Sequence, residues 1–535
     1  MRERLSRRSF LRYGASALAG SVVARPVGAQ HAAPMTVAPP EPVVPADFEL
    51  EEATIAELQD AMRSGARTSR SICEAYRARI AELDPKLHAV LETNPDALDI
   101  ADQMDTERKA GRVRGPMHGI PVLLKDNIAT ADKMMTTAGS LALVGAIPPR
   151  DAPLVARLRD AGAVILGKTN LSEWANIRST QSSSGWSARG GQCANPYALD
   201  RNPCGSSSGT GAAIAANFAA VGIGTETDGS IVCPSSACSL VGVKPTLGLM
   251  DGAGIIPIAH SQDTAGPMTR TVADASVLLG VLAGRDYSTS LDPAGLRGAR
   301  IGVARKKVFG YSPEADALVD AAIAVLKGQG AVIVDPADIP HLGDYDDSEL
   351  TVLLYELKAD LAAYLAAWAP PRAAVKTLAD VIAFNEANRA AEMPYFGQEL
   401  FLRAQEKGPL TDRAYRDALA KDRRLSRTEG LDVVLARHNL DALVAPTGSP
   451  PWPTDLLNGD HFLGASSTPA AVAGYPSVAV PVGYSFGLPV GMSFIGKANS
   501  EATLLKLAYA YEQAAKPRKP PRFLPQWSPE LNPSR

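Results

Sequence analysis

The sequence is poor in the residues that would indicate a metal site or a disulfide scaffold. It has seven histidines and five cysteines in 535 residues. They form no His-Glu-x-x-His motif and no paired Cys-x-x-Cys motifs, which are typical of zinc sites. We therefore expect no metal and no cofactor. Five cysteines are also too few for a disulfide framework, and one of them is necessarily unpaired in a monomer.

The chain also lacks an excess of charge of either sign. Hydrophobic residues make up 46% of it, charged residues 21%, and the formal net charge is -3. This balance gives no general electrostatic reason to bind nucleic acid and is typical of a soluble globular protein. Beyond the first residues, lysine and arginine concentrate at 516–522. We expect this cluster to be a solvated tail, and we expect residues 521–535 to lie outside the folded domain as the tail of the chain.

The N-terminal segment predicts export. Ser-Arg-Arg-Ser-Phe-Leu at residues 6–11 is followed by an apolar run at 13–23 and by the small-residue pattern Val27-Gly-Ala29. This arrangement is typical of a twin-arginine signal peptide over residues 1–29. A membrane anchor is the alternative, but the run is shorter than the roughly 20 residues that a spanning helix needs.

We therefore expect passage through the twin-arginine translocation machinery, cleavage after Ala29, and a periplasmic or secreted protein without stable membrane insertion. Residues 30–47 are rich in proline and alanine and predict a flexible lead-in to the folded domain.

Short apolar runs alternate with helical patterns along the rest of the chain. Helical spacing of apolar residues occurs, for example, at 272–282 and 315–326, and capping-box patterns occur at Thr54-x-x-Glu57 and Ser71-x-x-Glu74. The expected strands lie at 122–124, 164–166, 221–223, 301–303, 332–334, 443–444 and 478–480. The alternation predicts an α/β fold.

Two glycine-rich loops carry serines. They are Pro-Cys-Gly-Ser-Ser-Ser-Gly at 203–209 and Gly-Thr-Glu-Thr-Asp-Gly-Ser-Ile at 224–231. Small residues let a carbonyl group approach bare backbone N–H groups, which are the donors that an oxyanion needs. A serine hydroxyl is a weak nucleophile at neutral pH and needs an adjacent base. The histidines are scattered, and none lies within a glycine-rich motif.

Lys125 is the better candidate for the base. It ends the apolar run 120–124, which predicts a buried strand where desolvation would lower the lysine pKa. A serine in the 205–208 cluster could relay a proton between Lys125 and Ser230. Each feature alone has a simpler explanation, because a Gly/Ser run before an apolar helix such as 212–220 is usually a turn with an N-cap or a phosphate cradle. A lysine at a strand end is normally solvated, and no lysine follows the glycines as Walker A requires.

The joint pattern resembles the amidase signature family from about residue 50 to beyond residue 504. Cys204-Gly-Ser-Ser-Ser-Gly209 is similar to the family's Gly-Gly-Ser-Ser-Gly-Gly, and Glu226-Thr-Asp-Gly-Ser-Ile231 to its Asp-x-Gly-Gly-Ser-Ile. Further matching stretches are 115–121, 243–248, 263–268 and 487–491. The resemblance implies one large α/β/α sandwich around a mixed sheet, in a domain spanning 48–520. The largely helical region 340–440 is then expected to cover the substrate entrance.

The same resemblance implies the roles of three side chains. Ser230 is the nucleophile, Ser206 is the bridging serine that the family holds by a cis peptide, and Lys125 is the base. The expected reaction is hydrolysis of a carboxamide through an acyl-enzyme, without a metal.

The resemblance also places an oxyanion hole at the backbone N–H groups of Thr227, Asp228, Gly229 and Ser230. Asp228 stands where the family has glycine, and its carboxylate would repel the developing negative charge unless it points away. Aspartate tolerates a left-handed backbone better than most residues, so the loop geometry is compatible with it.

The cysteines near these motifs leave two alternatives. If the loops lie together, Cys204 and Cys233 are the most plausible disulfide, whereas buried free thiols are an equally good explanation. A catalytic cysteine is less favoured, because Ser230 holds the nucleophile position.

Among members of the family, the stretches 185–191 and 225–234 are most similar to bacterial peptide amidases. This implies that the substrate is the C-terminal amide of a peptide and that ammonia is released. The alternative is a broader hydrolase of aryl, aliphatic or fatty acyl amides. A glutaminase component of a tRNA-dependent amidotransferase shares the motifs, but it works in the cytoplasm with partner proteins. The joint presence of Lys125, Ser206 and Ser230 argues against a non-catalytic binding protein.

Export should depend on the pair Arg7-Arg8, because the twin-arginine route recognises that pair. Replacing both by lysine should keep the protein in the cytoplasm, as measured by immunoblots of fractionated cells. Lysine at Arg2 and Arg4 is the matched control and should leave export intact. Unchanged delivery of the Arg7-Arg8 variant to the periplasm would show that another route is used.

Overall fold

The computed structural model describes residues 48–370 and 373–528. The expected signal peptide, the lead-in and the last part of the expected tail, residues 529–535, lie outside this range. In the part that is described, no helix is long and apolar enough to cross a bilayer.

A mixed sheet forms the centre of the fold. Eleven strands of the described chain follow the order β1-β3-β2-β6-β8-β7-β12-β13-β11-β9-β10. The strands β3, β2 and β6 run parallel, as do β11, β9 and β10, and the others pair antiparallel. The strands are β1 (Val90–Thr93), β2 (Pro121–Lys125), β3 (Val164–Thr169), β6 (Val221–Glu226), β7 (Val241–Lys244), β8 (Thr264–Thr269), β9 (Arg300–Val303), β10 (Val332–Val334), β11 (Ala442–Pro446), β12 (Ser477–Ser485) and β13 (Leu488–Ile495). A separate two-stranded sheet pairs β4 (Trp186–Ser187) with β5 (Gly191–Gln192).

All seven strands expected from apolar runs are present, which confirms the α/β class. Four strands of the main sheet, β1, β7, β8 and β13, were not expected from the sequence. Their sequences interrupt the apolar run with glycine, proline or polar residues, as in Leu-Pro-Val-Gly-Met-Ser-Phe-Ile of β13. The strands β7, β8 and β13 each pair with a neighbour on both sides, and a local pattern does not show such pairing.

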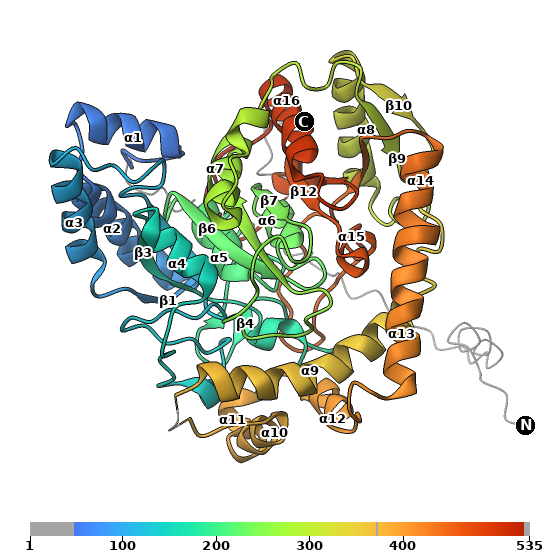
Figure 1. Ribbon diagram of the computed structural model, residues 1–535, viewed down its shortest axis with the longest axis horizontal. Coiled ribbons are helices and arrows are strands. Elements are labelled where there is room, and N and C mark those ends of the chain that lie inside the picture. The colour runs from blue at the N-terminus through green and yellow to red at the C-terminus, as the bar shows by residue number, and fades with distance from the viewer. Residues whose placement is uncertain (1–47, 371–372, 529–535) are drawn as a thin grey trace, which may run out of the picture. The chain divides into compact units, whose positions relative to one another are not determined.

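Helices cover the sheet and extend from its edges (Figure 1). The longest of those described, α9, lies across the lower part of the view above α10, α11 and α12, and α13 and α14 lie along its right side. The helices are α1 (Ile55–Ser64), α2 (Ser69–Leu87), α3 (Ala97–Lys109), α4 (Pro153–Asp160), α5 (Ser208–Ala215), α6 (Val232–Ala237), α7 (Val272–Ala283), α8 (Pro313–Gly328), α9 (Asp346–Trp368), α10 (Leu378–Ala387), α11 (Arg389–Glu392), α12 (Glu399–Gln405), α13 (Arg413–Arg423), α14 (Asp432–Arg437), α15 (Thr468–Ala473) and α16 (Glu501–Ala515). A π-helical segment, Arg424–Leu431, joins α13 to α14.

Local sequence explains where two of the helices begin. Thr54 and Glu57 form the expected capping box of α1. The box expected at Ser71 is placed differently, because the N-cap of α2 is Thr68 and Ser71 is the third helical residue, whose side chain accepts from the cap backbone. Both threonine and serine satisfy the free N–H groups of a helix start, so the pattern alone does not separate the two registers.

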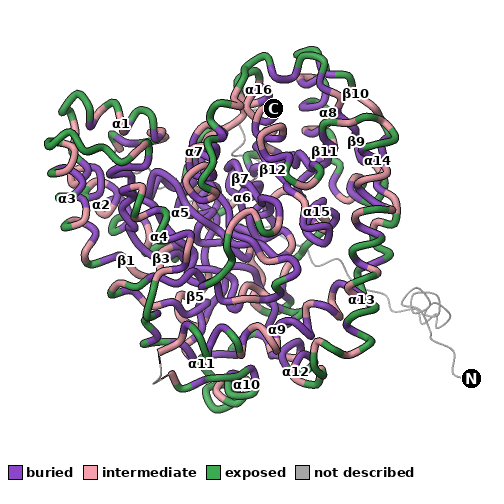
Figure 2. The backbone as a smooth tube through the Cα atoms, in the orientation of Figure 1, coloured by how far each residue is buried: buried purple, intermediate pink, exposed green. Residues whose placement is uncertain are grey.

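The helix α5 occupies the interior of the fold. Every one of its residues is buried, and Figure 2 shows it among the purple central segments while the outer helices expose green faces. Its apolar pattern led us to expect a helix over 212–220, but the helix begins at Ser208 and ends at Ala215. Gly209 must be small because an added Cβ would lie 2.4 Å from the carbonyl oxygens of Ala89 and Asn170.

The parallel strands β2 and β6 end at the same edge of the sheet. Lys125 is the last residue of β2, and Thr225 and Glu226 end β6, which is its hydrogen-bonded neighbour. Ligands of α/β proteins bind outside the carboxyl ends of such strands. The sheet therefore brings the predicted lysine and the second glycine-rich loop to one place.

Candidate active site

The Lys125 side chain is fully buried at the end of β2. Its Nζ lies 2.8 Å from Ser206 Oγ, 2.9 Å from Thr225 Oγ1 and 3.1 Å from the Thr225 carbonyl oxygen. Burial lowers the pKa of the lysine to about 7, although the nearby Asp263 and Glu226 carboxylates favour its charged form. A neutral amine can donate to the two Thr225 oxygens and still offer its lone pair to the Ser206 hydroxyl.

Two other lysines of the sheet are fully buried, Lys168 and Lys244. Burial lowers the pKa of each to about 8. Lys168 donates to the Ile128 carbonyl and the Thr136 hydroxyl, and Lys244 donates to the carbonyls of Pro245 and Tyr475. A low pKa is therefore not unique to Lys125. Among these three lysines, Lys125 alone contacts a serine of the glycine-rich loops.

The two glycine-rich loops lie against each other. The backbone N–H of Ser207 donates to the Ser230 carbonyl over 3.1 Å, and Ser207 Oγ exchanges hydrogen bonds with the Thr225 backbone. The Gly205–Ser206 peptide bond is cis, as the family resemblance implied. Ser206 and Ser230 both line one cavity of about 610 Å³. The structure thus brings Lys125, Ser206 and Ser230 together.

The loop at 227–230 exposes its backbone to this cavity. All four of these residues line it, and within the described chain none of their N–H groups donates a hydrogen bond to a protein acceptor. Gly229 has a φ of +80°, and an added Cβ would lie 3.1 Å from Ser467 Oγ, so glycine fits this position for two reasons. Four unused donors on one tight loop are suited to bind an oxyanion.

The Asp228 carboxylate is held by another element. Its Oδ2 accepts a hydrogen bond of 2.6 Å from Thr468 Oγ1 at the start of α15. Burial raises the pKa of this carboxyl group. The carboxylate is thus tied to α15 by a side-chain contact, and the backbone N–H groups of the loop remain unused by protein acceptors.

Several residues that brace the loop were not assigned a role from the sequence. Glu226 Oε2 accepts from the N–H groups of Ile231 and Val232 over 2.7 and 3.0 Å, which closes the turn around Ser230. Thr227 Oγ1 donates to Asp263 Oδ1 over 2.5 Å. Glu226 and Asp263 both lie inside stretches that match the family motifs, and this match could have identified them from the sequence.

The contacts of Thr225 were also missed. Its hydroxyl lies 2.9 Å from Lys125 Nζ and accepts from Asn127 Nδ2 over 3.0 Å. Asn127 follows Lys125 by two residues in the chain, yet the contact depends on the pairing of β2 with β6. A single sequence carries no sign of that pairing.

A disulfide joins the first loop to α6, the helix that follows the second loop. Cys204 and Cys233 are bonded, with their Cα atoms 5.9 Å apart, and both line the cavity. The remaining cysteines, Cys73, Cys193 and Cys238, are free and buried. The structure therefore selects the disulfide from the two alternatives that the sequence left open.

The wall of the cavity is uncharged or acidic. Its described lining contains the carboxylates of Asp228 and Asp460 and no lysine, arginine or histidine. The Asp460 carboxylate accepts from the Ser184 backbone, the Ser184 hydroxyl and Trp452 Nε1, and so it fixes the cavity wall. From the helical region expected over the entrance, Leu353 of α9 reaches the lining.

Known proteins with similar sequences share nearly the whole chain. The amidase family model matches residues 71–505. A probable amidase of Arabidopsis thaliana is 42% identical over 502 residues, which cover 89% of this chain and 93% of the relative. The family match therefore includes both serine-bearing loops and the strand that ends in Lys125.

Solved structures that are similar to this chain are also amidases. The native peptide amidase of Stenotrophomonas maltophilia superposes with a TM-score of 0.85 at 52% identity, over 89% of this chain and all of the solved chain. An amidase family protein of Bacillus anthracis superposes with a TM-score of 0.79 at 36% identity, over 88% of this chain and 93% of its own. The family model, the sequence identity and the fold agree: the chain belongs to the amidase family and hydrolyses carboxamide bonds.

Proposed function

We propose that this amidase removes the C-terminal amide of peptides through Lys125, Ser206 and Ser230. The observation that carries the proposal is the buried Lys125 amine, 2.8 Å from Ser206 Oγ, beside a serine-bearing loop whose N–H groups are unused. The peptide amidase of Stenotrophomonas maltophilia, at 52% identity, supports the choice of substrate.

The first half-reaction forms an acyl-enzyme. Neutral Lys125 takes the proton of Ser206, and Ser206 in turn takes the proton of Ser230 as the Ser230 oxygen attacks the amide carbon. The N–H groups of residues 227–230 hold the oxyanion of the tetrahedral intermediate. The same relay then returns a proton to the leaving nitrogen, so the C–N bond breaks and ammonia departs.

The second half-reaction regenerates the serine. Water attacks the ester of Ser230 and passes a proton to the relay, and the ester oxygen takes that proton back as it leaves. The products are a free carboxylic acid and ammonia. The uncharged or acidic wall of the cavity repels a carboxylate, which favours release of the acid.

The same wall supports a preference among substrates. A free-acid peptide would place its terminal carboxylate in a cavity without a described cationic side chain, whereas a primary amide carries no charge. Apolar groups lie at the cavity edge, where Phe462, 54% exposed, packs edge-on against Trp452 with ring centroids 5.9 Å apart. The site therefore suits an apolar residue next to the scissile amide.

We also propose that the mature enzyme works outside the cytoplasm. The twin-arginine pattern is the main support. The bond between Cys204 and Cys233 adds to it, because disulfides persist mainly in oxidising compartments.

The rate should follow the ionisation of Lys125. Since only the neutral amine accepts a proton, kcat/KM should rise with pH up to about 7 and then level off. Lys125→Arg should lose at least about 100-fold in activity, because guanidinium does not deprotonate in proteins. Ser230→Ala should show no turnover at any pH. Ammonia release measured between pH 5 and 9 tests this, and an active arginine variant would remove Lys125 from the mechanism.

Substrate preference should follow the charge of the cavity. An N-acetyl dipeptide amide ending in leucine should be hydrolysed at least about tenfold faster than its match ending in glutamate, because the glutamate side chain meets Asp228 and Asp460. Mass spectrometry should show the free acid with an intact backbone. Cleavage of internal peptide bonds, or activity confined to long-chain acyl amides, would contradict the peptide amide assignment.

The disulfide should stabilise both the fold and the site. Cys204→Ala with Cys233→Ala removes a bond between residues separated by 29 positions, which should lower the free energy of unfolding by about 3 kcal/mol. It should also lower kcat, since the loop that carries Ser206 loses its covalent link to α6, the helix that follows Ser230. Chemical denaturation and ammonia release measure the two effects. A thiol reductant should lower the free energy of unfolding and kcat of the wild type and leave both values of the double variant unchanged. An equal decrease in both proteins would contradict the assignment, because it would mean that other cysteines respond.

A further inference from the structure

A second cavity of about 720 Å³ lies between α8, β12, α16 and the segment that follows α16. None of its described lining residues lines the catalytic cavity. Its volume is within the range of roughly 300–1,000 Å³ that is typical of small-molecule sites. Neither the sequence motifs nor the amidase reaction assigns it a role.

The segment after α16, which forms one wall of this cavity, is held in place by hydrogen bonds. The hydroxyls of Tyr197 and Tyr484 both donate to the Lys519 carbonyl, over 2.5 and 3.0 Å, and the Lys519 N–H donates to Tyr484 Oη over 2.6 Å. The neighbouring Arg518 forms an ion pair with Glu52. The segment after α16 is therefore held against β12 by several hydrogen bonds, although we expected part of it to be a solvated tail.

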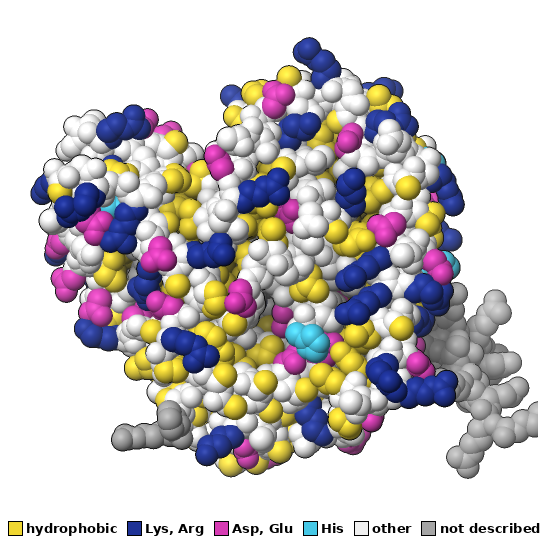
Figure 3. Space-filling view, in the orientation of Figure 1, with side chains coloured by type: hydrophobic (Ala, Val, Ile, Leu, Met, Phe, Trp, Pro, Cys, Tyr) yellow, Lys and Arg dark blue, Asp and Glu magenta, His cyan; other side chains and the backbone are white. Residues whose placement is uncertain are grey.

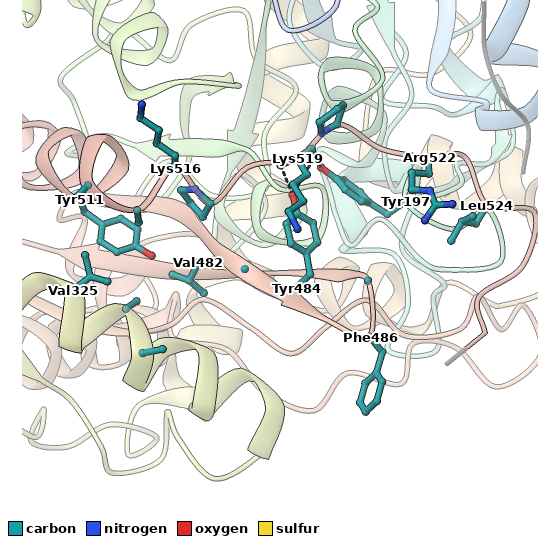
Figure 4. Close-up of a pocket in the computed structure, with 18 of the residues that line it drawn as sticks. Tyr197, Val325, Val482, Tyr484, Phe486, Tyr511, Lys516, Lys519, Arg522 and Leu524 are labelled. Carbon is teal, nitrogen blue, oxygen red and sulfur yellow. Dashed lines mark hydrogen bonds between the residues drawn. The ribbon is translucent and has the colours of Figure 1, made fainter. Parts of the chain in front are cut away.

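The two ends of the cavity differ in chemistry (Figure 4). Val325, Val482 and Tyr511 lie at one end, and Arg522 and Leu524 lie at the other. Between them, Lys519 lies near the ring of Tyr484, with Nζ 5.8 Å from the ring centroid. Lys516 also lines the cavity, but its side chain points away from the others.

The charged groups of this cavity have one sign. Its described lining contains three cationic residues and no aspartate or glutamate. Lys519 and Arg522 are both exposed, and in the described chain neither forms an ion pair. On the face that Figure 3 shows, positive and negative side chains are interspersed. The cavity is thus complementary to an anion.

The apolar end contains a tyrosine hydroxyl that faces the cavity. Tyr511 is 1% exposed, and no residue of the described chain hydrogen-bonds to its hydroxyl, while burial raises its pKa. Figure 4 shows the hydroxyl pointing toward Val482, inside the cavity. The hydroxyl faces the cavity and is unused by the described protein, so it can hydrogen-bond a polar atom of a ligand in place of solvent.

We propose that this cavity binds a small hydroxyaryl carboxylate. The ring lies between Val325 and Val482 with its hydroxyl bonded to Tyr511, and the carboxylate lies at Lys519 and Arg522. Carboxylic acids are also what amide hydrolysis releases, so the cavity takes ligands of the product class. This step rests on the amidase activity and not on the choice of peptide substrates.

Isothermal titration calorimetry of the full chain with para-hydroxyphenylbutyrate tests the proposal. Phenylbutyrate, which lacks the hydroxyl, should bind about fivefold more weakly. Para-hydroxyphenylbutanol, which lacks the charge, should bind about tenfold more weakly. Equal affinity for the alcohol and the acid, or no measurable binding, would overturn the proposal.

Variants locate the binding. Lys519→Gln with Arg522→Gln should weaken the acid about tenfold and leave the alcohol unaffected, while Arg416→Gln, an exposed cation on α13, should change neither. Tyr511→Phe should abolish the difference between the hydroxylated and plain acids. Unchanged affinity in the double variant would place the ligand elsewhere, for example in the catalytic cavity, and overturn the proposal. Thermal unfolding confirms that each variant is folded.

One further variant tests whether the cavity binds a free ligand or is occupied by the C-terminal residues of the chain. A chain that ends at Ser528 should bind the acid with the same affinity as the full chain. An affinity at least about tenfold higher would mean that residues 529–535 occupy the cavity in the intact protein. That result would overturn the proposal of a free carboxylate.

Discussion

The site depends on the removal of one lysine from water. Lys125 is placed at the end of a central strand, where burial lowers its pKa to about 7, and three oxygens within 3.1 Å compensate for the lost hydration. A solvated lysine at this position would stay charged and could not accept a proton. The pairing of β2 with β6 buries this amine and brings Thr225 to it. Thr225 and Ser206 then supply its hydrogen-bond partners.

The loops around Lys125 are braced by buried polar contacts from several elements. Glu226 closes the turn of the second loop, Asp263 holds Thr227, and Thr468 holds the carboxylate of Asp228. Each contact uses the side chain of one segment to fix the backbone or side chain of another. The four N–H groups at 227–230 can stay unpaired in the protein because the loop is held by these contacts.

Much of this arrangement could be predicted from the sequence. The apolar runs locate seven strands of the main sheet, and one of these runs indicates the buried Lys125 at its end. The glycine-rich motifs indicate Ser230, and the family resemblance selects Ser206 from the 205–208 cluster. Strands β7, β8 and β13 could not be predicted in this way, because long-range pairing holds them in place. For the same reason, the contacts of Asn127 with Thr225 and of Asp228 with Thr468 could not be found from local patterns. The Cys204–Cys233 bond depended on the proximity of two loops, which the sequence left undecided.

That bond also changes the connectivity of the molecule. With the chain between them, Cys204 and Cys233 close a covalent ring that contains Ser206, all of α5 and β6, and Ser230. A single cut of the backbone inside this ring would open it without releasing either part. The two serines would remain in one covalently linked molecule, so one cleavage within this segment cannot separate the relay from the nucleophile.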